Sequence, residues 1–460
     1  MRESAPGWKI SPLGRLVDIA IGGTPSRDIP RYWAIEGTEG FPWVAISDLH
    51  ERVITNTKEQ ITPVGVANSN VKPVIPGTVL MSFKLSLGRM AFAGTDLFTN
   101  EAIAAFKSRG AIDEQYLYYV LPEAVRSAAT DVAIKGATLN KKSLAALQIS
   151  HPALNAQKAI ARVLASIDTA IEKTKALIAK HQQIKVGLMH NLFTRGVLPN
   201  GQLRPPRSEA PELYRETALG WIPQEWLVRR LGGLAAIVSG VTLGAKPGPN
   251  DVIDAPYLRV ANVQDGYLDL SEIKTVRVSR STLEQLRLLP GDVLMNEGGD
   301  FDKLGRGTVW LGEIEDCVHQ NHVFRVRTDQ SQLLPRYLAL YSASSFGKSY
   351  FLRSSKQSTN LASINSTQLN AYPIALAPIE EQAWIVERLG ATGGRIEGLE
   401  REAEKLQKQK LGLMQDLLTG RVPVEVDGQG SATSEQALEQ KVLSRLGERA
   451  QALEVDIDAI

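Results

Sequence analysis

Several features by which protein classes are recognised are missing from this sequence. One cysteine, Cys317, occurs in 460 residues, so no internal disulfide can form and we expect a reducing compartment, the cytoplasm. No run of 18 apolar residues occurs, and the N-terminal segment lacks the apolar stretch of a signal peptide. We therefore expect neither a membrane span nor secretion. The formal net charge of +2 is too small to indicate a polyanionic partner by itself.

Signatures of phosphate, methyl-donor and metal chemistry are also lacking. The nearest match to a P-loop, at residues 347–349, has Ser342 where the first glycine should stand. Neither a Gly-x-Gly-x-x-Gly after a strand nor an Asp/Asn-Pro-Pro-aromatic methyltransferase motif is present. Cys317, His319 and His322 are residue types that bind zinc, but in a strand His322 would face away from the other two. We expect a non-catalytic chain without a bound cofactor or metal.

An internal repeat is the most informative feature that the sequence does contain. Residues 157–197 align without a gap on residues 382–422, and 14 of the 41 positions are identical. The preceding stretches match at smaller, shifting offsets, so that Trp8 corresponds to Trp226 and Gly22 to Gly240. Matching anchors at shifting offsets are typical of one scaffold with loops of different length. The pattern predicts a tandem duplication of a globular unit followed by a long helix.

The predicted fold class is α+β, with two mixed α/β domains in a tandem pseudo-repeat. Short strands such as VLMSF and TVWLG, punctuated by Gly and Pro, indicate the mixed character of each domain. The segment between the repeats is rich in Pro, Gly and Asn, and the C-terminal tail carries a net charge of −4. The predicted order is domain 1–151, helix 152–198, linker 199–213, domain 214–376, helix 377–425 and tail 426–460.

Each long helix carries one apolar stripe with Lys, Gln and Glu between the apolar positions. Gly393 and Gly394 interrupt the second stripe and are expected to loosen or kink that helix. Residues 157–195 have a net charge of +5 and residues 380–421 of −1, which favours an antiparallel coiled coil of the two helices. The alternative is that each helix packs only on its own domain. The predicted pairing residues are Ile160, Leu164, Ile171, Leu188, Leu192, Leu389, Ile396, Leu406, Leu413 and Leu417.

Several segments place Lys or Arg beside small hydroxyl or amide residues, and they occur in both repeats. Hydroxyl and amide groups bond phosphates, Arg can bind guanine, and Asn or Gln can bind adenine. The pattern favours nucleic-acid binding, whereas the alternative for any single segment is a solvated loop. The candidate DNA-binding residues are Thr24, Ser26, Arg27, Lys84, Ser86, Arg89, Lys135, Asn140, Thr242, Lys246, Lys303, Arg306, Lys356, Gln357 and Asn360.

Over residues 1–425 the sequence resembles the specificity subunits of type I restriction-modification systems. The resemblance rests on Trp followed by LGxL and GGTPS at residues 8–26, with a second copy at 226–242. It also rests on PGxVLM followed by Gly-Arg, and on APIEEQ leading into a helix that ends in GLMQDLLTGRV at 377–422. The combination of these motifs is more specific than any one of them.

Two departures from that family pattern occur in the repeated motifs. The second copy lacks the Pro and Ser of GGTPS and has Gly240 to Leu243 there. The Asn-Gln pair that is frequent in the family is matched by Asn100 with Glu101 in the first copy, and by Asn321 with His322 in the second.

The resemblance implies that each domain is a target recognition domain that reads one half of a bipartite site in double-stranded DNA. It implies that the helices set the spacer between the halves and dock two methyltransferase subunits, which restriction subunits join. S-adenosylmethionine, ATP and Mg are then expected on those partners, with no cofactor in this chain. The alternative is a non-catalytic scaffold of two modules that binds partner proteins through its long helices.

Overall fold

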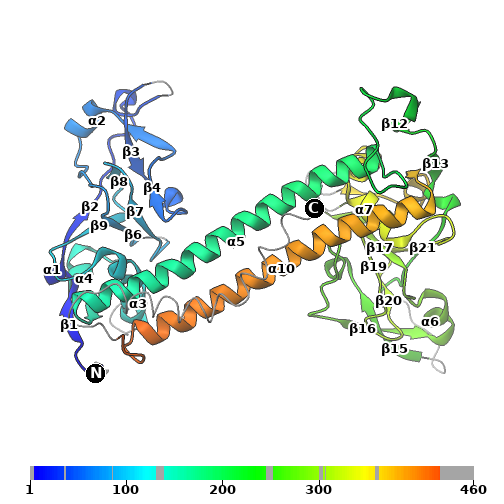
Figure 1. The fold of residues 1–460 in the computed structure, drawn as a ribbon. Coiled ribbons are helices and arrows are strands. Elements are labelled where there is room, and N and C mark those ends of the chain that lie inside the picture. Colours follow the sequence, from blue (N-terminus) through cyan, green and yellow to red (C-terminus); the bar gives the residue numbers. More distant parts are fainter. Residues whose placement is uncertain are drawn as a thin grey trace. The chain divides into compact units, whose positions relative to one another are not determined.

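The chain divides into two compact units in the computed structural model, which describes residues 5–35, 38–84, 86–130, 139–244, 252–299, 304–305, 307–357 and 362–424. Unit 1 comprises residues 1–174 and 401–460, and unit 2 comprises residues 175–400. Both long helices, α5 (Leu154–Thr194) and α10 (Ile379–Leu417), therefore contribute to both units (Figure 1). The acidic tail that the sequence analysis delimits at 426–460 lies outside the described residues.

Unit 1 is built on a five-stranded sheet with the order β2-β9-β6-β7-β4. Strands β2, β9, β6 and β7 pair antiparallel, and β4 joins β7 in parallel. A second sheet has the order β5-β3-β8, and β1 pairs with β10. The strands are β1 (Lys9–Pro12), β2 (Val17–Ile21), β3 (Phe41–Val44), β4 (Val53–Ile54), β5 (Glu59–Ile61), β6 (Val79–Ser82), β7 (Met90–Ala93), β8 (Phe98–Thr99), β9 (Ile103–Ser108) and β10 (Gln148–His151).

Unit 2 repeats this topology. Its four-stranded sheet, β14-β21-β17-β19, matches β2-β9-β6-β7, and its sheet β16-β15-β20 matches β5-β3-β8. The short hairpin β11-β12 and the sheet β18-β23-β22 have no counterpart among the described residues of unit 1. The strands are β11 (Tyr214–Thr217), β12 (Gly220–Pro223), β13 (Leu227–Arg230), β14 (Ala235–Ser239), β15 (Val252–Leu258), β16 (Lys274–Ser279), β17 (Val293–Asn296), β18 (Gly298–Gly299), β19 (Gly307–Val309), β20 (Val318–His319), β21 (Val323–Thr328), β22 (Lys356–Gln357), β23 (Ala362–Ser363) and β24 (Pro373–Leu376).

Short helices cover the sheets of both units and connect their strands. Helix α4 begins at a capping box in which Asn140 accepts from two backbone N–H groups, and α9 begins at one in which Asn365 accepts from the backbone N–H of Gln368. The helices other than α5 and α10 are α1 (Leu13–Leu16), α2 (Pro63–Ala67), α3 (Glu114–Thr130), α4 (Lys141–Ala146), α6 (Arg280–Leu286), α7 (Pro335–Ala343), α8 (Ser345–Ser354) and α9 (Ser366–Asn370).

The long helices are continuous and enter the cores of both units. Helix α10 runs through Gly393 and Gly394 without ending. In α5, Ile160 and Leu164 belong to the main core of unit 1, which also contains Leu417 and Leu418 from the end of α10 and its next residue. The core of unit 2 correspondingly contains Leu192 and Phe193 from the end of α5, with Ile385 and Leu389 from the start of α10. Each globular core is therefore completed by side chains from both repeats.

The residues predicted to pair the two helices fall into two groups. Ile160, Leu164 and Leu417 lie in the main core of unit 1, and Leu192 and Leu389 lie in that of unit 2 with Leu188 at its margin. A separate small cluster within unit 1 joins the helices directly, where Ile167 and Ile171 of α5 contact Leu406, with Leu413 packed against them. Ile396 is also buried. Five of the ten residues predicted to pair the helices are thus buried in the main cores of the two units, and Leu188 is partly buried against the core of unit 2.

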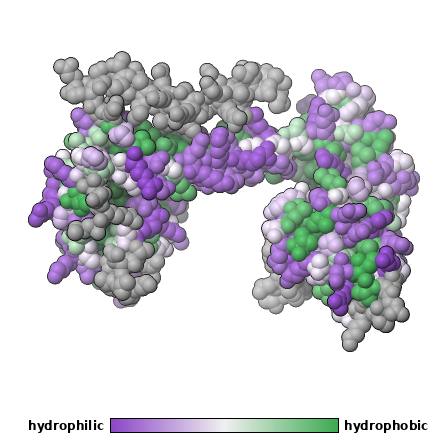
Figure 2. All heavy atoms as spheres, turned by 90° about the horizontal axis from the view of Figure 1, so that it is seen from below, coloured by the Kyte–Doolittle hydropathy of each residue, from purple (hydrophilic) through white to green (hydrophobic). Residues whose placement is uncertain are grey.

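Charged and polar side chains occupy the remaining surface of the helices. Along the middle of α5, residues such as Lys173, Lys175, Lys180 and Gln182 are exposed. Figure 2 shows the corresponding stretch of the long helices as largely hydrophilic on the face that it draws. Among the residues that the structure describes, no helix is long and apolar enough to cross a membrane.

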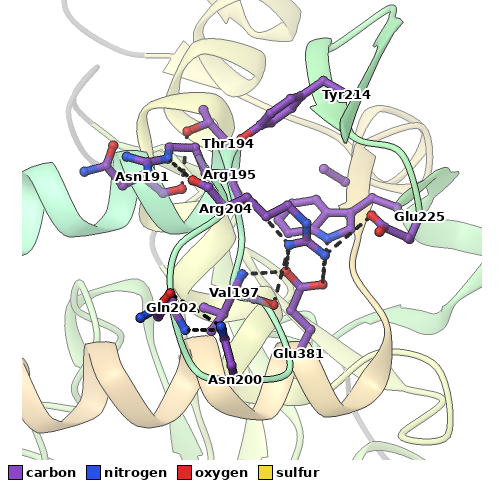
Figure 3. Close-up of polar contacts among 12 residues, drawn as sticks. Asn191, Thr194, Arg195, Val197, Asn200, Gln202, Arg204, Tyr214, Glu225 and Glu381 are labelled. Atoms are coloured by element: carbon purple, nitrogen blue, oxygen red, sulfur yellow. Dashed lines mark hydrogen bonds and ion pairs between the residues drawn. The ribbon is translucent and has the colours of Figure 1, made fainter. Parts of the chain in front are cut away.

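The segment predicted as a linker between the repeats is packed against the start of α10 (Figure 3). The carboxylate of Glu381 accepts hydrogen bonds from both terminal nitrogens of Arg204, from the backbone N–H of Val197 at 2.7 Å and from Nε1 of Trp226 at 3.0 Å. Glu381 and Arg204 are 3% and 4% exposed. At Gly196, where φ is +64°, an added Cβ would lie 2.0 Å from the Glu381 carboxylate. The ion pair therefore joins the end of α5, the linker and the start of α10.

We expect Glu381→Gln to destabilise unit 2 by about 3 kcal/mol, because Arg204 would remain buried without its counter-charge. The amide of the new glutamine would also point its N–H groups toward Arg204, Val197 and Trp226, which all donate hydrogen bonds to the carboxylate and could not accept one from the amide. Chemical denaturation of the full chain measures this change. Glu380→Gln, an exposed neighbour on the same helix, is the matched control and should leave the denaturation midpoint unchanged. Equal midpoints for the two variants would contradict the prediction.

Candidate nucleic-acid interface

Three loops of unit 1, two of which carry candidate DNA-binding residues, meet at one edge of the main sheet. Residues 22–27 follow β2, residues 83–84 and 86–89 follow β6, and residues 100–102 precede β9. These three strands are neighbours, and Ser82 at the end of β6 pairs with Ile103 at the start of β9. The backbone N–H of Gly23 donates to Thr99 at 2.9 Å, and that of Phe83 donates to Ala102 at 3.0 Å. We call these three loops the loop cluster of unit 1.

In unit 2, the counterparts of these loops lie at the equivalent edge of that unit's own main sheet. The N–H of Val241, after β14, donates to His319 at 2.7 Å, and the N–H of Glu297, after β17, donates to His322 at 3.0 Å. Strand β18, at residues 298–299, pairs with β23, which in turn pairs with β22. The segments that begin at residues 241, 297 and 356 therefore converge in space, and they form the loop cluster of unit 2.

In each cluster, the segment after the first strand of the main sheet (β2 or β14) crosses closely over the segment before the neighbouring strand (β9 or β21). A glycine at this backbone crossing makes the close approach possible. A Cβ on Gly22 would lie 2.1 Å from the carbonyl oxygen of Thr99, and a Cβ on Gly240 would lie 1.9 Å from that of His319. No side chain fits such an approach. The recurrence of Gly22 and Gly240 in the sequence repeat thus has a steric cause, and it marks the same crossing in both units.

In unit 1, three of the candidate residues surround a carboxylate that was not among the candidates. The hydroxyl of Thr24 donates to Oε2 of Glu101. This hydrogen bond, helped by the backbone N–H of Glu101 and by the charges of Lys84 and Arg27, lowers the pKa of the Glu101 carboxyl. Glu101 is therefore ionised at neutral pH, and its side chain is exposed. The one signal for it in the sequence is its place in the repeated Asn-Gln-like pair.

Arg27 is held by its neighbours and forms one side of the loop cluster. Its terminal nitrogens donate to both carboxylate oxygens of Glu59, one at 3.0 Å, and its guanidinium lies 3.8 Å from the ring centroid of Trp33. The hydrogen bond to Glu59 raises the pKa of Arg27. Because these donors are already bonded, the Arg27 side chain is held in one position beside the loop cluster.

The other candidate DNA-binding residues of unit 1 differ in whether they already have hydrogen-bond or ion-pair partners within the chain. Arg89 is exposed and makes no ion pair with another described residue, and Ser26 is exposed while its carbonyl accepts from Nε1 of Trp33 at 3.2 Å. The carbonyl of Ser86 accepts from the hydroxyl of Ser82. Asn140 caps α4, so its side-chain oxygen has a structural partner. Lys135 lies outside the described residues.

In unit 2, Thr242 and Lys356 are exposed at the loop cluster, and Gln357 lies beside Lys356 in β22. His322 is 57% exposed, and its Nδ1 lies 2.5 Å from Oε2 of Glu297. The remaining candidates of this unit fall outside the described residues; they are Lys246, Lys303, Arg306 and Asn360.

Strand register corrects the correspondence between the two repeats at this point. The sequence motif pairs Glu101 with His322, each after an asparagine. In the sheets, however, Thr99 lies opposite Val44 as His319 lies opposite Leu258, and both positions bond the backbone after the crossing glycine. Counting on from Thr99 and His319, the residue that takes the place of Glu101 in unit 2 is Asn321. The sequence alignment was one residue out of register.

The residues considered as zinc ligands have other roles. Cys317 is buried, its Sγ donates to the Val318 carbonyl, and burial raises its pKa to about 12. His319 is fully buried with Nδ1 2.6 Å from the carbonyl of Val323, and burial lowers its pKa to about 4. Among the described residues, no three His, Cys, Asp or Glu side chains are grouped so that they could hold a metal ion.

Comparison with known proteins identifies relatives of both halves. Residues 6–180 and 223–408 match the family described as type I restriction modification DNA specificity domain. The putative type I restriction enzyme MjaX specificity subunit of Methanocaldococcus jannaschii is 30% identical over 211 residues, which cover 45% of this chain and 49% of that protein. The MjaVIII specificity subunit of the same organism is 22% identical over 438 residues, 91% of this chain and 93% of that protein. This chain therefore spans about half of one curated relative and most of another.

The fold is also similar to a solved structure. The crystal structure of a type I restriction-modification system S subunit from M. genitalium superposes with a TM-score of 0.52 and 13% sequence identity. The superposition covers 91% of this chain and 97% of that one. The architecture is thus shared over nearly the whole length.

The buried His319 predicts that stability falls in mild acid. Below pH 6.5, the ordinary pKa, the unfolded chain gains a proton at this residue, whereas the folded chain stays neutral down to about pH 4. Acidification therefore favours unfolding across this window, with a loss of about 2 kcal/mol at pH 5.

Chemical denaturation at pH 7 and pH 5 measures this loss. His319→Gln, which can still donate to Val323 but does not titrate, should show a smaller difference between the two pH values. His50→Gln, at an exposed position, serves as the control and should behave like the unchanged chain. The interpretation fails if all three proteins lose the same stability.

Proposed function

This chain belongs to the type I restriction modification DNA specificity domain family, and we propose on that basis that it is the DNA-reading subunit of such a system. Each unit reads one half of a bipartite site in double-stranded DNA. The chain itself is non-catalytic and acts in the cytoplasm on DNA. The observation that carries the proposal is the presence of two loop clusters, one in each unit, at the same sheet edge and around the same glycine crossing.

The chemistry of the loop clusters supports DNA as the ligand. Exposed Arg89 and Lys356, with the hydroxyl groups of Ser26 and Thr242, are groups that bind phosphates and base edges. Glycine at the crossing keeps the backbone of neighbouring loops close together, so several short side chains reach one surface. Two clusters built on one topology but carrying different side chains suit a site whose two halves differ in sequence.

We propose that α5 and α10 pair as an antiparallel coiled coil that sets the spacer between the half-sites. Three observations support this role. The start of α5 and the end of α10 share the core of unit 1, and the opposite ends share that of unit 2. Ile171 contacts Leu406, and Nζ of Lys410 lies 2.5 Å from Asp168. A helix of 41 residues is about 60 Å long, which is enough to span several base pairs of unread DNA.

The catalytic partners are part of the same proposal. Two methyltransferase subunits dock on the helices and supply S-adenosylmethionine, and restriction subunits supply ATP-dependent, Mg-dependent cleavage. The exposed polar surface along the middle of α5 is available for such a contact. This chain contributes the sequence specificity.

Mapping of N6-methyladenine in a methylation-free bacterial genome tests the function. The chain is expressed with the methyltransferase encoded beside it, and each protein is also expressed alone. The proposal expects one bipartite methylated motif that requires both proteins. A stable complex of the two proteins without any methylated motif would reject it and favour a scaffold that binds partners through its helices.

Arg89→Ala should weaken recognition of the half-site that unit 1 reads by about 1–3 kcal/mol, because a base contact of Arg is worth that much. Binding of the purified complex to duplexes with single base changes measures the effect. The other half-site should keep its discrimination. Arg126→Ala, which removes an exposed arginine on α3, is the control. Unaltered affinity for every base variant of the first half-site would reject the role of Arg89.

Lengthening the helices by one turn should change the accepted spacer by about one to two base pairs, since a turn adds about 5.4 Å and a base pair about 3.4 Å. The turn is inserted in α5 between Lys175 and Gln182, with a matching turn in α10 after Glu400. Replacing Leu177 and Ile178 with alanine, without a change of length, is the control. A methylated motif with the original spacer in the lengthened protein would contradict the spacer role.

A further inference from the structure

Glu101 presents an exposed carboxylate at the loop cluster of unit 1. It lies on the loop just before β9, between the loops that carry Thr24 and Lys84, and its carboxylate is exposed. An ionised carboxylate has about four acceptor sites and no donor. The Thr24 hydroxyl occupies one of these sites, so others remain for a ligand. The groups that such a carboxylate can select in the major groove are exocyclic amino groups, N4 of cytosine or N6 of adenine.

The surroundings of Glu101 reduce the cost of placing an anion beside DNA. A lone carboxylate would be repelled by the phosphates, whereas Lys84 and Arg27 both act electrostatically on this carboxyl. Arg27 is itself locked between Glu59 and Trp33 and cannot swing away without breaking two hydrogen bonds. Thr24 holds the carboxylate in one orientation, which lowers the entropic cost of binding.

Unit 2 has different hydrogen-bonding chemistry at the equivalent position. Strand register places Asn321 there, and its backbone N–H donates to Val241 as part of the same crossing. An amide both donates and accepts, which matches adenine, whereas a carboxylate only accepts. The two units thus share a backbone geometry and differ in the group that they present at one position, as two readers of unlike half-sites require.

We propose that Glu101 is a specificity-determining residue, which accepts a hydrogen bond from the exocyclic amino group of one base in the half-site read by unit 1. Thr24 is its positioning residue. The inference rests on the proposed function, because it needs a bipartite DNA site.

The first test compares methylated motifs. The full chain is co-expressed with its methyltransferase, unchanged and as Glu101→Gln, which keeps the shape of the side chain but adds donors. Because an amide matches adenine, we expect the preference at one position of one half-site to shift about tenfold from cytosine toward adenine, with the other half-site unchanged. Glu123→Gln, the same change at an exposed site on α3, is the control and should reproduce the original motif.

The second test uses the unchanged complex and does not depend on the folding of a variant. Each cytosine or adenine of the half-site is replaced in turn by an analogue without its amino group, and binding is measured. One replacement should weaken binding of the unchanged complex about tenfold, and the same replacement should have little effect on the Glu101→Gln complex if that variant folds. Thr24→Val should weaken the discrimination without changing which base is preferred.

The outcomes separate the inference from the function on which it rests. A bipartite motif that is identical for the unchanged chain and for Glu101→Gln overturns the role of Glu101 and leaves the function intact. Loss of discrimination in the half-site read by unit 2 also overturns it. If the unchanged chain directs no bipartite methylation, the proposed function fails and the inference fails with it.

Discussion

The buried carboxylate of Glu381 is the interaction on which the order of unit 2 depends. Taking an ionised pair out of water costs several kcal/mol unless its remaining hydrogen bonds are satisfied. Here Arg204, Val197 and Trp226 satisfy them from the linker, the end of α5 and the start of the second repeat. Because these groups are far apart in sequence, the ion pair can form only when all of those segments are in place.

The apolar cores also connect the two sequence repeats, because each core contains side chains from both of them. Leu417 from the end of α10 is buried with Ile160 in unit 1, and Leu192 from the end of α5 is buried with Ile385 in unit 2. Neither globular domain therefore completes its core from its own repeat alone. Each unit, with its loop cluster, is therefore anchored to both long helices.

The two loop clusters share a backbone scaffold and differ in the side chains that they carry. The crossing at Gly22 and Gly240 fixes the backbone in both units, since nothing larger than hydrogen fits there. Side chains around the crossing are free to differ, and they do: an acid stands in unit 1 where an amide stands in unit 2. The residues that fix the backbone geometry are thus different from the residues that vary between the two units.

The sequence by itself determined the duplication, the two long helices and the family, because apolar periodicity and repeated glycines are local signals that survive without coordinates. It also singled out loops that do converge, including those of Thr24 and Lys84. Only the tertiary structure decided which residues surround Glu101, that Arg27 and Asn140 have structural partners, and that Asn321 is the counterpart of Glu101. Five of the ten helix residues predicted to pair proved to lie in domain cores. Long-range hydrogen bonds, strand register and the choice between two apolar partners depend on contacts across the fold, and no spacing along the chain encodes them.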